Sequence, residues 1–299
     1  MIEVVGREPD LLGECPVWDP RIDVLYTIDI DGRCVNRFDP VTGDRHTRHL
    51  SGRPGSMALT PDADRLLMAV EESLVFLDWS TGRTEPWLEL ETGGPANRLN
   101  DGRCDRQGRF WVGSMHEDAS ESSGVLHRVD PDGTNAEFRR AIGVSNGLAF
   151  SPDGRTMYFA DTIADTIWTY EYDPDTGEPR NREVFTDFTD LPGQPDGGCV
   201  DAEGCYWTAC VFGSAIARLT PDGAVDRIID LPVGKPTMAA FGGTRLDILF
   251  VTSIGGGGSH VRPDPQGANG RLLAIDVGVG GIAETPFGLG TAPSQPVHQ

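Results

Sequence analysis

Short apolar strands recur along the chain, and each follows a polar turn of a similar kind. Segments such as DRQGRFWVGSM and PDGRTMYFAD show an aromatic-rich strand directly after such a turn. Most of these strands are followed by a second one that ends in a DG or TG dipeptide, which indicates a hairpin. The turn anchors lie 41 to 48 residues apart, at Asp19, Asp62, Asp105, Asp153, Asp201 and Gly242.

This spacing predicts propeller blades, because a repeat of roughly 45 residues with several short strands is typical of them. Six such units account for nearly all of residues 1–299, so we predict one all-β domain, a six-bladed β-propeller. A strand within residues 2–8 is expected to close the ring against the last blade. Residues 288–299 are small and polar and are expected to form a loose tail. A pair of β-sandwiches is the alternative, but it explains neither the period nor the register shared by the units.

The charge of the chain disfavours nucleic acid and anionic membranes as partners, since both require a basic surface. Lysine and arginine total 25 against 46 acidic residues, a net charge of −21, which is compatible with a GC-rich genome or with salt adaptation. No run of 18 apolar residues and no signal-peptide pattern is present, so we expect a cytoplasmic protein, monomeric or homodimeric. The six cysteines lack paired spacing and are expected to be reduced and buried.

Three of the units place an amide or acid at the same step. Asn100, Asn146 and Asp196 each lie eight residues before a turn glycine. Side chains at one register of a repeat lie at one height around the axis, so we expect these three to converge. An Asn-Gly or Asp-Gly pair is common in turns, but the shared register favours a site. The other units are expected to line the axis with Glu14, Ser56 and either Lys235 or Thr237.

Oxygen ligands without histidine or cysteine indicate a hard cation at this axis. Carboxylates and amides select Ca²⁺, Mg²⁺ or Mn²⁺, although Zn²⁺ or Fe²⁺ held by oxygen alone stays open. Two carboxylates, Glu14 and Asp196, balance a divalent charge, and the amides add neutral oxygens. The predicted fold is therefore a propeller with a central metal site.

Five ordered motifs resemble those of the gluconolactonase, regucalcin and luciferin-regenerating enzyme (SMP-30-like) family. The resemblance covers roughly residues 11–282 and implies a six-bladed propeller with one divalent metal ion at its axis. It also implies that Glu14, Asn146 and Asp196 are the metal ligands, with Asn100 beside the metal or bound to it. The motifs are GECPVWDP, RLNDGRCDRQGRFWVGSM, GVSNGLAFSPDGRTMYFADT, PDGGCVDAEGCYWTAC and PVGKPTMAAFGG.

The same resemblance implies further contacts with a sugar lactone. Arg98 and Asp101 flank Asn100 and would contact the substrate, and an acid after the GSM segment would touch a sugar hydroxyl. Asp118 has the best spacing for that role and Glu117 is next. His116 either caps its loop or assists the leaving alkoxide.

The implied activity is metal-dependent hydrolysis of sugar aldonolactones to aldonic acids, with Asp196 as the general base. Three other readings stay open. A non-hydrolytic relative resembling strictosidine synthase would use a Glu at the axis and lack the metal ligands, although Asn146 and Asp196 argue against it. A related metal-propeller hydrolase would act on other lactones or on organophosphate esters, and a non-catalytic propeller would only bind a partner. The lactone, its ring size and the native metal are not determined by these residues.

Overall fold

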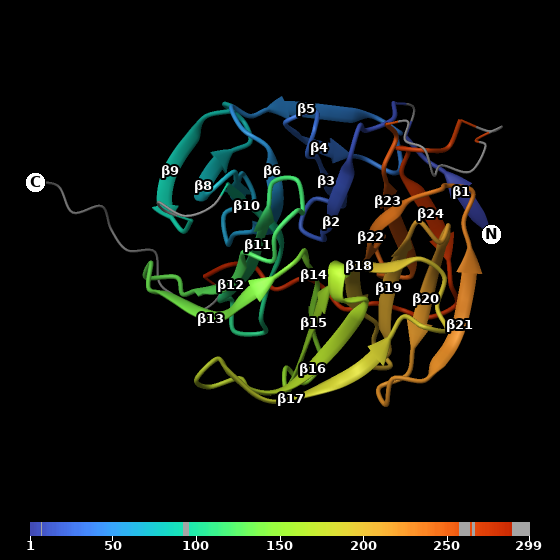
Figure 1. Cartoon of the computed structure of the whole chain (residues 1–299). Coiled ribbons are helices and arrows are strands. Elements are labelled where there is room, and N and C mark those ends of the chain that lie inside the picture. Colours follow the sequence, from blue (N-terminus) through green and yellow to red (C-terminus); the bar gives the residue numbers. More distant parts are fainter. Residues whose placement is uncertain (7, 92–95, 257–263, 265–266, 289–299) are drawn as a thin grey trace, which may run out of the picture.

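Six four-stranded antiparallel sheets make up the structure, as the repeat predicted. The computed structural model describes residues 1–6, 8–91, 96–256, 264 and 267–288. The sheets surround a common centre, with one strand of each on the inside and one at the periphery (Figure 1). The inner strands are β2 (Gly13–Asp19), β6 (Pro54–Leu59), β10 (Asn97–Cys104), β14 (Ser145–Phe150), β18 (Gln194–Val200) and β22 (Pro236–Gly242).

In five sheets the other strands follow outward in chain order, and in the sixth the outer strand is β1. The second strands are β3 (Val24–Asp29), β7 (Arg65–Val70), β11 (Phe110–His116), β15 (Thr156–Asp161), β19 (Tyr206–Val211) and β23 (Ile248–Ser253). The third are β4 (Cys34–Phe38), β8 (Ser73–Asp78), β12 (Gly124–Val129), β16 (Thr166–Asp173), β20 (Ala215–Leu219) and β24 (Leu273–Asp276). The outer strands are β5 (Arg45–His49), β9 (Thr84–Glu89), β13 (Asn135–Ile142), β17 (Glu178–Asp187), β21 (Val225–Asp230) and β1 (Ile2–Val4).

The ring closes through the first residues of the chain. Strand β1 pairs with β24, so the amino-terminal strand completes the blade built from β22, β23 and β24. Inner strands β2 and β22 pack against each other and seal the circle. The predicted closing strand is thereby confirmed for Ile2–Val4. The tail predicted for residues 288–299 lies, from residue 289 onward, outside the described residues.

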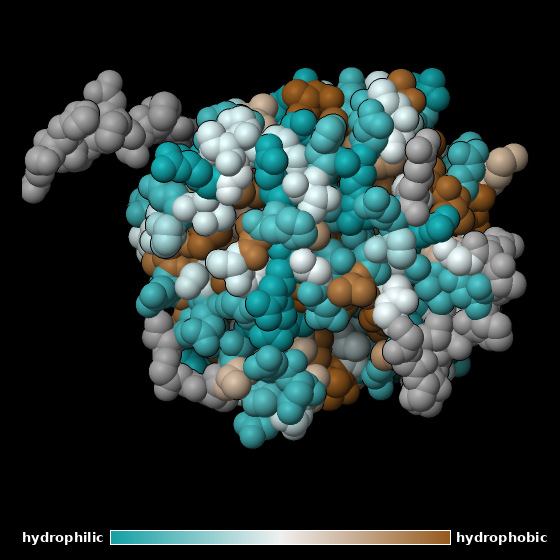
Figure 2. Space-filling view, turned by 90° about the horizontal axis from the view of Figure 1, so that it is seen from above, coloured by the Kyte–Doolittle hydropathy of each residue, from teal (hydrophilic) through white to brown (hydrophobic). Residues whose placement is uncertain are grey.

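Apolar side chains pack mainly between neighbouring blades rather than in one central mass. Six buried clusters occur in the described residues, and each joins one blade to the next. Burial decreases from the inner to the outer strand of a sheet: β10 is buried throughout, whereas β13, the outer strand of the same sheet, is largely exposed. The edge of the molecule seen in Figure 2 is mostly hydrophilic, with hydrophobic residues in small groups. In the described chain, the single short helix is a 3-10 turn at Thr162–Ala164, and no helix is long and apolar enough to span a bilayer.

Every inner strand carries an irregularity near the same end. The pairing register shifts after Glu14 in β2, after Leu99 in β10, after Asn146 in β14 and after Pro195 in β18, with equivalent shifts in β6 and β22. A bulge of this kind turns side chains out of the normal alternation and re-aims them. The six bulges therefore form one ring of redirected residues around the axis.

Candidate metal centre at the propeller axis

The bulge ring contains the four residues that the sequence predicted as metal ligands. Asn100 and Asp196 lie inside their bulges, whereas Glu14 and Asn146 are the last paired residues before theirs. All four thus share one level of the ring to within a residue. Asn100, Asn146 and Asp196 are buried, and Glu14 keeps a partly accessible side chain.

A chain of hydrogen bonds joins this level across three blades. Arg98 Nη1 donates to Asn100 Oδ1 at 2.7 Å, and Asn100 Nδ2 donates to Asn146 Oδ1 at 3.2 Å. Asn146 Nδ2 in turn donates to Thr162 Oγ1 at 2.8 Å. The Thr162 hydroxyl donates to Pro195 O at 2.7 Å, beside Asp196. Both asparagines are therefore oriented, and Asn146 Oδ1 is held next to Asn100.

The carboxylates of this level are costly to ionise. Burial, followed by the charge of Asp101, raises the pKa of Glu14 to about 8. Burial, followed by the charges of Glu14 and Asp101, raises the pKa of Asp196 well above its usual range. Buried carboxylates that repel one another need a cation if all are to be ionised.

A count of charges indicates the charge of that cation. The carboxylates of Glu14, Asp101 and Asp196 influence one another, Glu284 acts on Asp101 and Arg103, and the nearby cations are Arg98 and Arg103. Fully ionised, this buried group carries two more negative than positive charges, the deficit that one divalent ion fills. Ser56 Oγ, Ser145 Oγ and Asp101 Oδ1 are also buried without a hydrogen-bond partner in the structure. The residues present therefore fit a divalent cation.

The donor set is of oxygen type and is mixed in charge. Among the residues that the structure describes, no three His, Cys, Asp or Glu side chains are gathered so as to hold a metal ion. The candidate set instead combines two carboxylates, Glu14 and Asp196, with the amides of Asn100 and Asn146. Such a set suits hard cations that accept neutral oxygen ligands.

The predicted substrate residues divide between the buried axis and the surface. Arg98 and Asp101 lie with the ligand set: both are buried, and Asp101 Oδ2 accepts a hydrogen bond from Leu148 N at 2.8 Å. Burial raises the pKa of Asp101 to about 6. Glu117 and Asp118 lie on the loop after β11, with 54% and 70% of their side chains exposed.

This loop is held by contacts of its own. Glu117 pairs with Arg53 at 3.0 Å, and His116 Nδ1 lies 2.6 Å from Asp118 Oδ1 and 3.2 Å from Ser120 Oγ. His116 therefore engages its own loop.

For the sixth blade, the structure distinguishes the two residues left open by the sequence. Thr237 lies in the bulge of β22, is buried, and donates to Gly13 O at 2.6 Å. Lys235 precedes the strand, and its Nζ lies 5.3 Å from the centre of the Phe212 ring at the surface. Thr237 is thus the residue at the level of the ligand set.

Three residues of the site were not identified from the sequence. Thr162 orients Asn146, and Arg103 and Glu284 form a buried ion pair near Asp101. Arg103 carried a recognisable signal, since it is a third charged residue beside Arg98 and Asp101 in an inner strand that is buried throughout. Glu284 carried none, because it lies in no strand and at no repeated step.

Comparison with known proteins decides the relationship. The pattern that defines the SMP-30/Gluconolactonase/LRE-like region matches residues 12–255. The chain belongs to this family. It is 37% identical over 287 residues to a 6-deoxy-6-sulfogluconolactonase of Pseudomonas putida, covering 96% of this chain and 98% of that protein. It is 34% identical over 289 residues to the pentonolactonase XacC of Haloferax volcanii, covering 91% and 93%.

A solved structure of the family has the same architecture. The calcium-binding protein regucalcin of Agrobacterium tumefaciens superposes with a TM-score of 0.88 and 31% identity, covering 95% of this chain and 96% of that one. The resemblance drawn from the five motifs is therefore confirmed, and so is the six-bladed propeller.

Proposed function

We propose that this family member is a divalent-metal-dependent lactonase that hydrolyses sugar aldonolactones to aldonic acids. Two relatives that cover nearly the whole chain are named as lactonases of sugar-derived lactones, and a structural relative is described as calcium-binding. The observation that carries the proposal is the set of half-buried Glu14 with buried Asn100, Asn146 and Asp196. Four different blades bring these residues to one level, within a group of side chains that has a deficit of two positive charges.

Glu14, Asn146 and Asp196 would hold the metal ion, with Asn100 beside it. When bound, a divalent ion polarises a lactone carbonyl and lowers the pKa of water. The amide of Asn146 is already oriented, because its Nδ2 donates to Thr162 Oγ1 and its Oδ1 accepts a hydrogen bond from Asn100 Nδ2. Ca²⁺, Mg²⁺, Mn²⁺, Zn²⁺ and Fe²⁺ remain candidates because oxygen ligands are permissive.

Asp196 would act as the general base. It accepts a proton from the attacking water, whose oxygen forms the new bond to the carbonyl carbon. The ring carbon–oxygen bond then breaks, and the ring oxygen takes back from Asp196 the proton that came from water, to give the open hydroxy acid. Arg98 and Asn100 are buried donors at the same level and would bind the lactone oxygens as negative charge develops.

The rim of the channel would recognise the polyol part of the substrate. Asp118 and Glu117 are exposed acceptors on the loop after β11, and His116 is tied to Asp118. Sugar hydroxyls pair well with such carboxylates. Asp101 is buried with the ligand set, below the rim, so its contact with substrate would need the ring of the lactone to reach deep into the channel.

A pH-indicator assay of acid release from a panel of aldono-1,4- and 1,5-lactones tests the proposal. Metal-stripped protein is compared with protein supplied with each of the five cations in turn. Hydrolysis that metal restores supports the proposal and identifies the sugar class. Tight metal binding without hydrolysis of any member would redirect the search to other lactones or organophosphate esters, and protein that binds no divalent ion would refute the site.

A further inference from the structure

The carboxy-terminal part of the described chain closes the channel at the end opposite the ligand set. Residues 280–288, called here the closing segment, bond to the last residue of β6 and to positions just beyond the ends of β18 and β10. Gly280 O accepts from Ala202 N at 2.9 Å, just beyond β18, and Phe287 N donates to Leu59 O, the last residue of β6, at 2.7 Å. The segment therefore spans the base of the channel.

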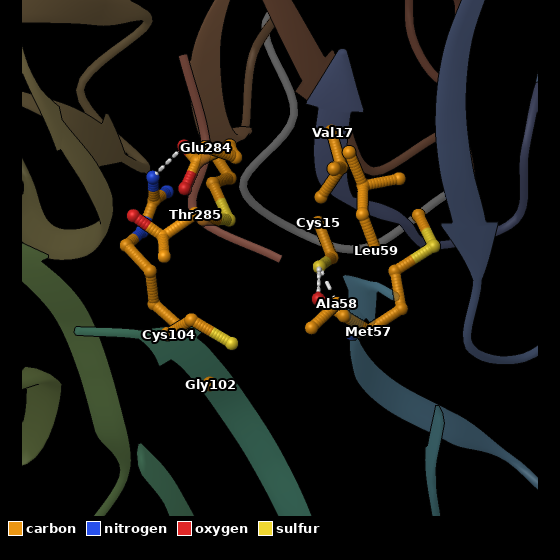
Figure 3. Close-up of a pocket in the computed structure, with 11 residues that line it drawn as sticks. Cys15, Val17, Met57, Ala58, Leu59, Gly102, Cys104, Glu284 and Thr285 are labelled. Atoms are coloured by element: carbon orange, nitrogen blue, oxygen red, sulfur yellow. Dashed lines mark hydrogen bonds and ion pairs between the residues drawn. The ribbon is translucent and has the colours of Figure 1, made fainter. Parts of the chain in front are cut away.

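One charged side chain of the closing segment enters that base. Glu284 forms an ion pair with Arg103 of β10, and only 17% and 9% of the two side chains are exposed. Arg103 Nη2 also donates to Gly198 O of β18 at 2.9 Å, two residues after Asp196. Figure 3 shows Glu284 and Thr285 on one side of a small cavity, across from Cys15 and Val17. The pair thus lies on the channel axis, below the ligand set.

The pair is poorly explained as a device for stability. Arg103 Nε and Asp101 Oδ1 are buried without partners, so the network around the pair is incompletely satisfied. A buried ion pair often adds little net stability, because desolvation offsets the attraction. The pair is joined to the site above through the inner strands: Arg103 follows Asn100 by three residues in β10, and its Nη2 donates to Gly198 O, two residues after Asp196 in β18.

We propose that Glu284 is a positioning residue for the metal centre, which neutralises Arg103 at the base of the channel so that the carboxylates above can bind a divalent cation. This inference rests on the proposed metal site. Without Glu284, the buried guanidinium stands uncompensated below the bound ion and repels it.

The test is calorimetric titration of metal-stripped protein with Mn²⁺ and with Ca²⁺. We expect Glu284→Gln, which keeps the shape of the side chain, to weaken divalent binding about tenfold, the lower end of what outer-shell changes cause. The double variant Arg103→Gln/Glu284→Gln restores the charge balance and is expected to regain most of the affinity. Asp10→Asn is the matched control, because Asp10 is also buried and paired with one arginine, Arg45 of outer strand β5.

The outcomes separate this inference from the proposed function. Wild-type protein that binds no divalent ion refutes the proposed function itself. Wild-type binding with equal affinity in Glu284→Gln overturns the inference, and so does a double variant as weak as the single one, since loss of packing would then explain both. If Glu284→Gln does not fold, Arg103→Gln decides: it is expected to bind at least as tightly as wild type, and weaker binding overturns the inference.

Discussion

The acidic side chains at the axis are distinguished by the free-energy cost of ionising them. Glu14 and Asp196 lie in surroundings that favour their neutral forms, and each repels the other. A bound cation reverses this preference, because it compensates both charges at once. Arg98 differs, since burial lowers its pKa and its guanidinium donates to Asn100 instead of neutralising a carboxylate directly. Ligand and substrate roles are therefore separable by mutation.

Replacing Asp196 and Arg98 should give different losses. Asp196→Ala removes a ligand and the proposed base, so we expect metal affinity to fall at least about tenfold and kcat about a thousandfold. Arg98→Ala removes a donor to the substrate and one positive charge near Glu14, so we expect a metal affinity that does not fall and a KM raised about tenfold or more. Titration calorimetry and steady-state kinetics measure both. An Asp196→Ala protein with full turnover would show that another group is the base.

Asp10 should leave a pH signature on stability that does not involve the axis. Burial, opposed by Arg45, raises the pKa of Asp10 from 3.8 to about 6. The folded state then binds the proton more tightly than the unfolded chain. The resulting stabilisation is complete below the unfolded pKa and is lost as the pH rises through about 6.

Comparison with Asp10→Asn isolates this effect. The free energy of unfolding of wild type, minus that of Asp10→Asn, should fall between pH 4 and pH 7 by up to about 3 kcal/mol. Urea unfolding at several pH values in the presence of chelator measures the difference. A difference that is constant with pH would mean that Arg45 offsets the effect of burial, so that the pKa of Asp10 is the same in the folded and unfolded states.

Within the inner strands, the bulges depend on close backbone approach. Gly147 follows Asn146 in β14 with a φ of +64°, and a methyl group there would lie 2.5 Å from Tyr206 Oη. Tyr206 Oη donates to Gly147 O at 2.8 Å, so the tyrosine cannot move away without losing that bond. The bulge that presents Asn146 is thus supported from the neighbouring blade.

Gly147→Ala should therefore damage both fold and site. We expect a loss of about 3 kcal/mol in the free energy of unfolding, from left-handed strain and overpacking together, along with weaker metal binding. Gly43→Ala is the control, because its φ is +74° but nothing lies within 4 Å of the added methyl. It should cost only about 1 kcal/mol and leave metal binding intact. Equal losses in the two variants would show that strain alone is responsible.

These strands also show how far sequence reasoning reaches. The repeat predicted the blades because each unit has the same strands and turns, and its register predicted which side chains share one level. The strand pairing shows that Glu14 and Asn146 each lie one position before their own bulge, whereas Asn100 and Asp196 lie inside theirs. Spacing along the sequence cannot resolve this difference. The Arg103–Glu284 pair joins residues 181 positions apart, one of which lies outside every strand, so no periodicity points to it.

Across the whole ring, the candidate ligand set is shared between blades and does not lie within one blade. Glu14, Asn100, Asn146 and Asp196 come from four blades, and the apolar clusters also join blade to blade. An ion bound by these residues would cross-link the closed circle at its centre. Unfolding any of those four blades would destroy the site, so metal binding and cooperative unfolding of the ring should be linked.

This linkage predicts how stability depends on metal concentration. Because an ion held at the axis would bind the folded ring and not the unfolded chain, an ion at a hundred times its Kd should stabilise the protein by about 2.7 kcal/mol, and at a thousand times by about 4.1 kcal/mol. Thermal unfolding at stepped concentrations of Mn²⁺ or Ca²⁺, with NaCl at matched ionic strength as control, measures the rise in Tm. Screening of the −21 net charge would raise Tm equally with NaCl. A rise in Tm that is confined to the divalent salt, and absent in Asp196→Ala, would show that the stabilising ion binds at the axis.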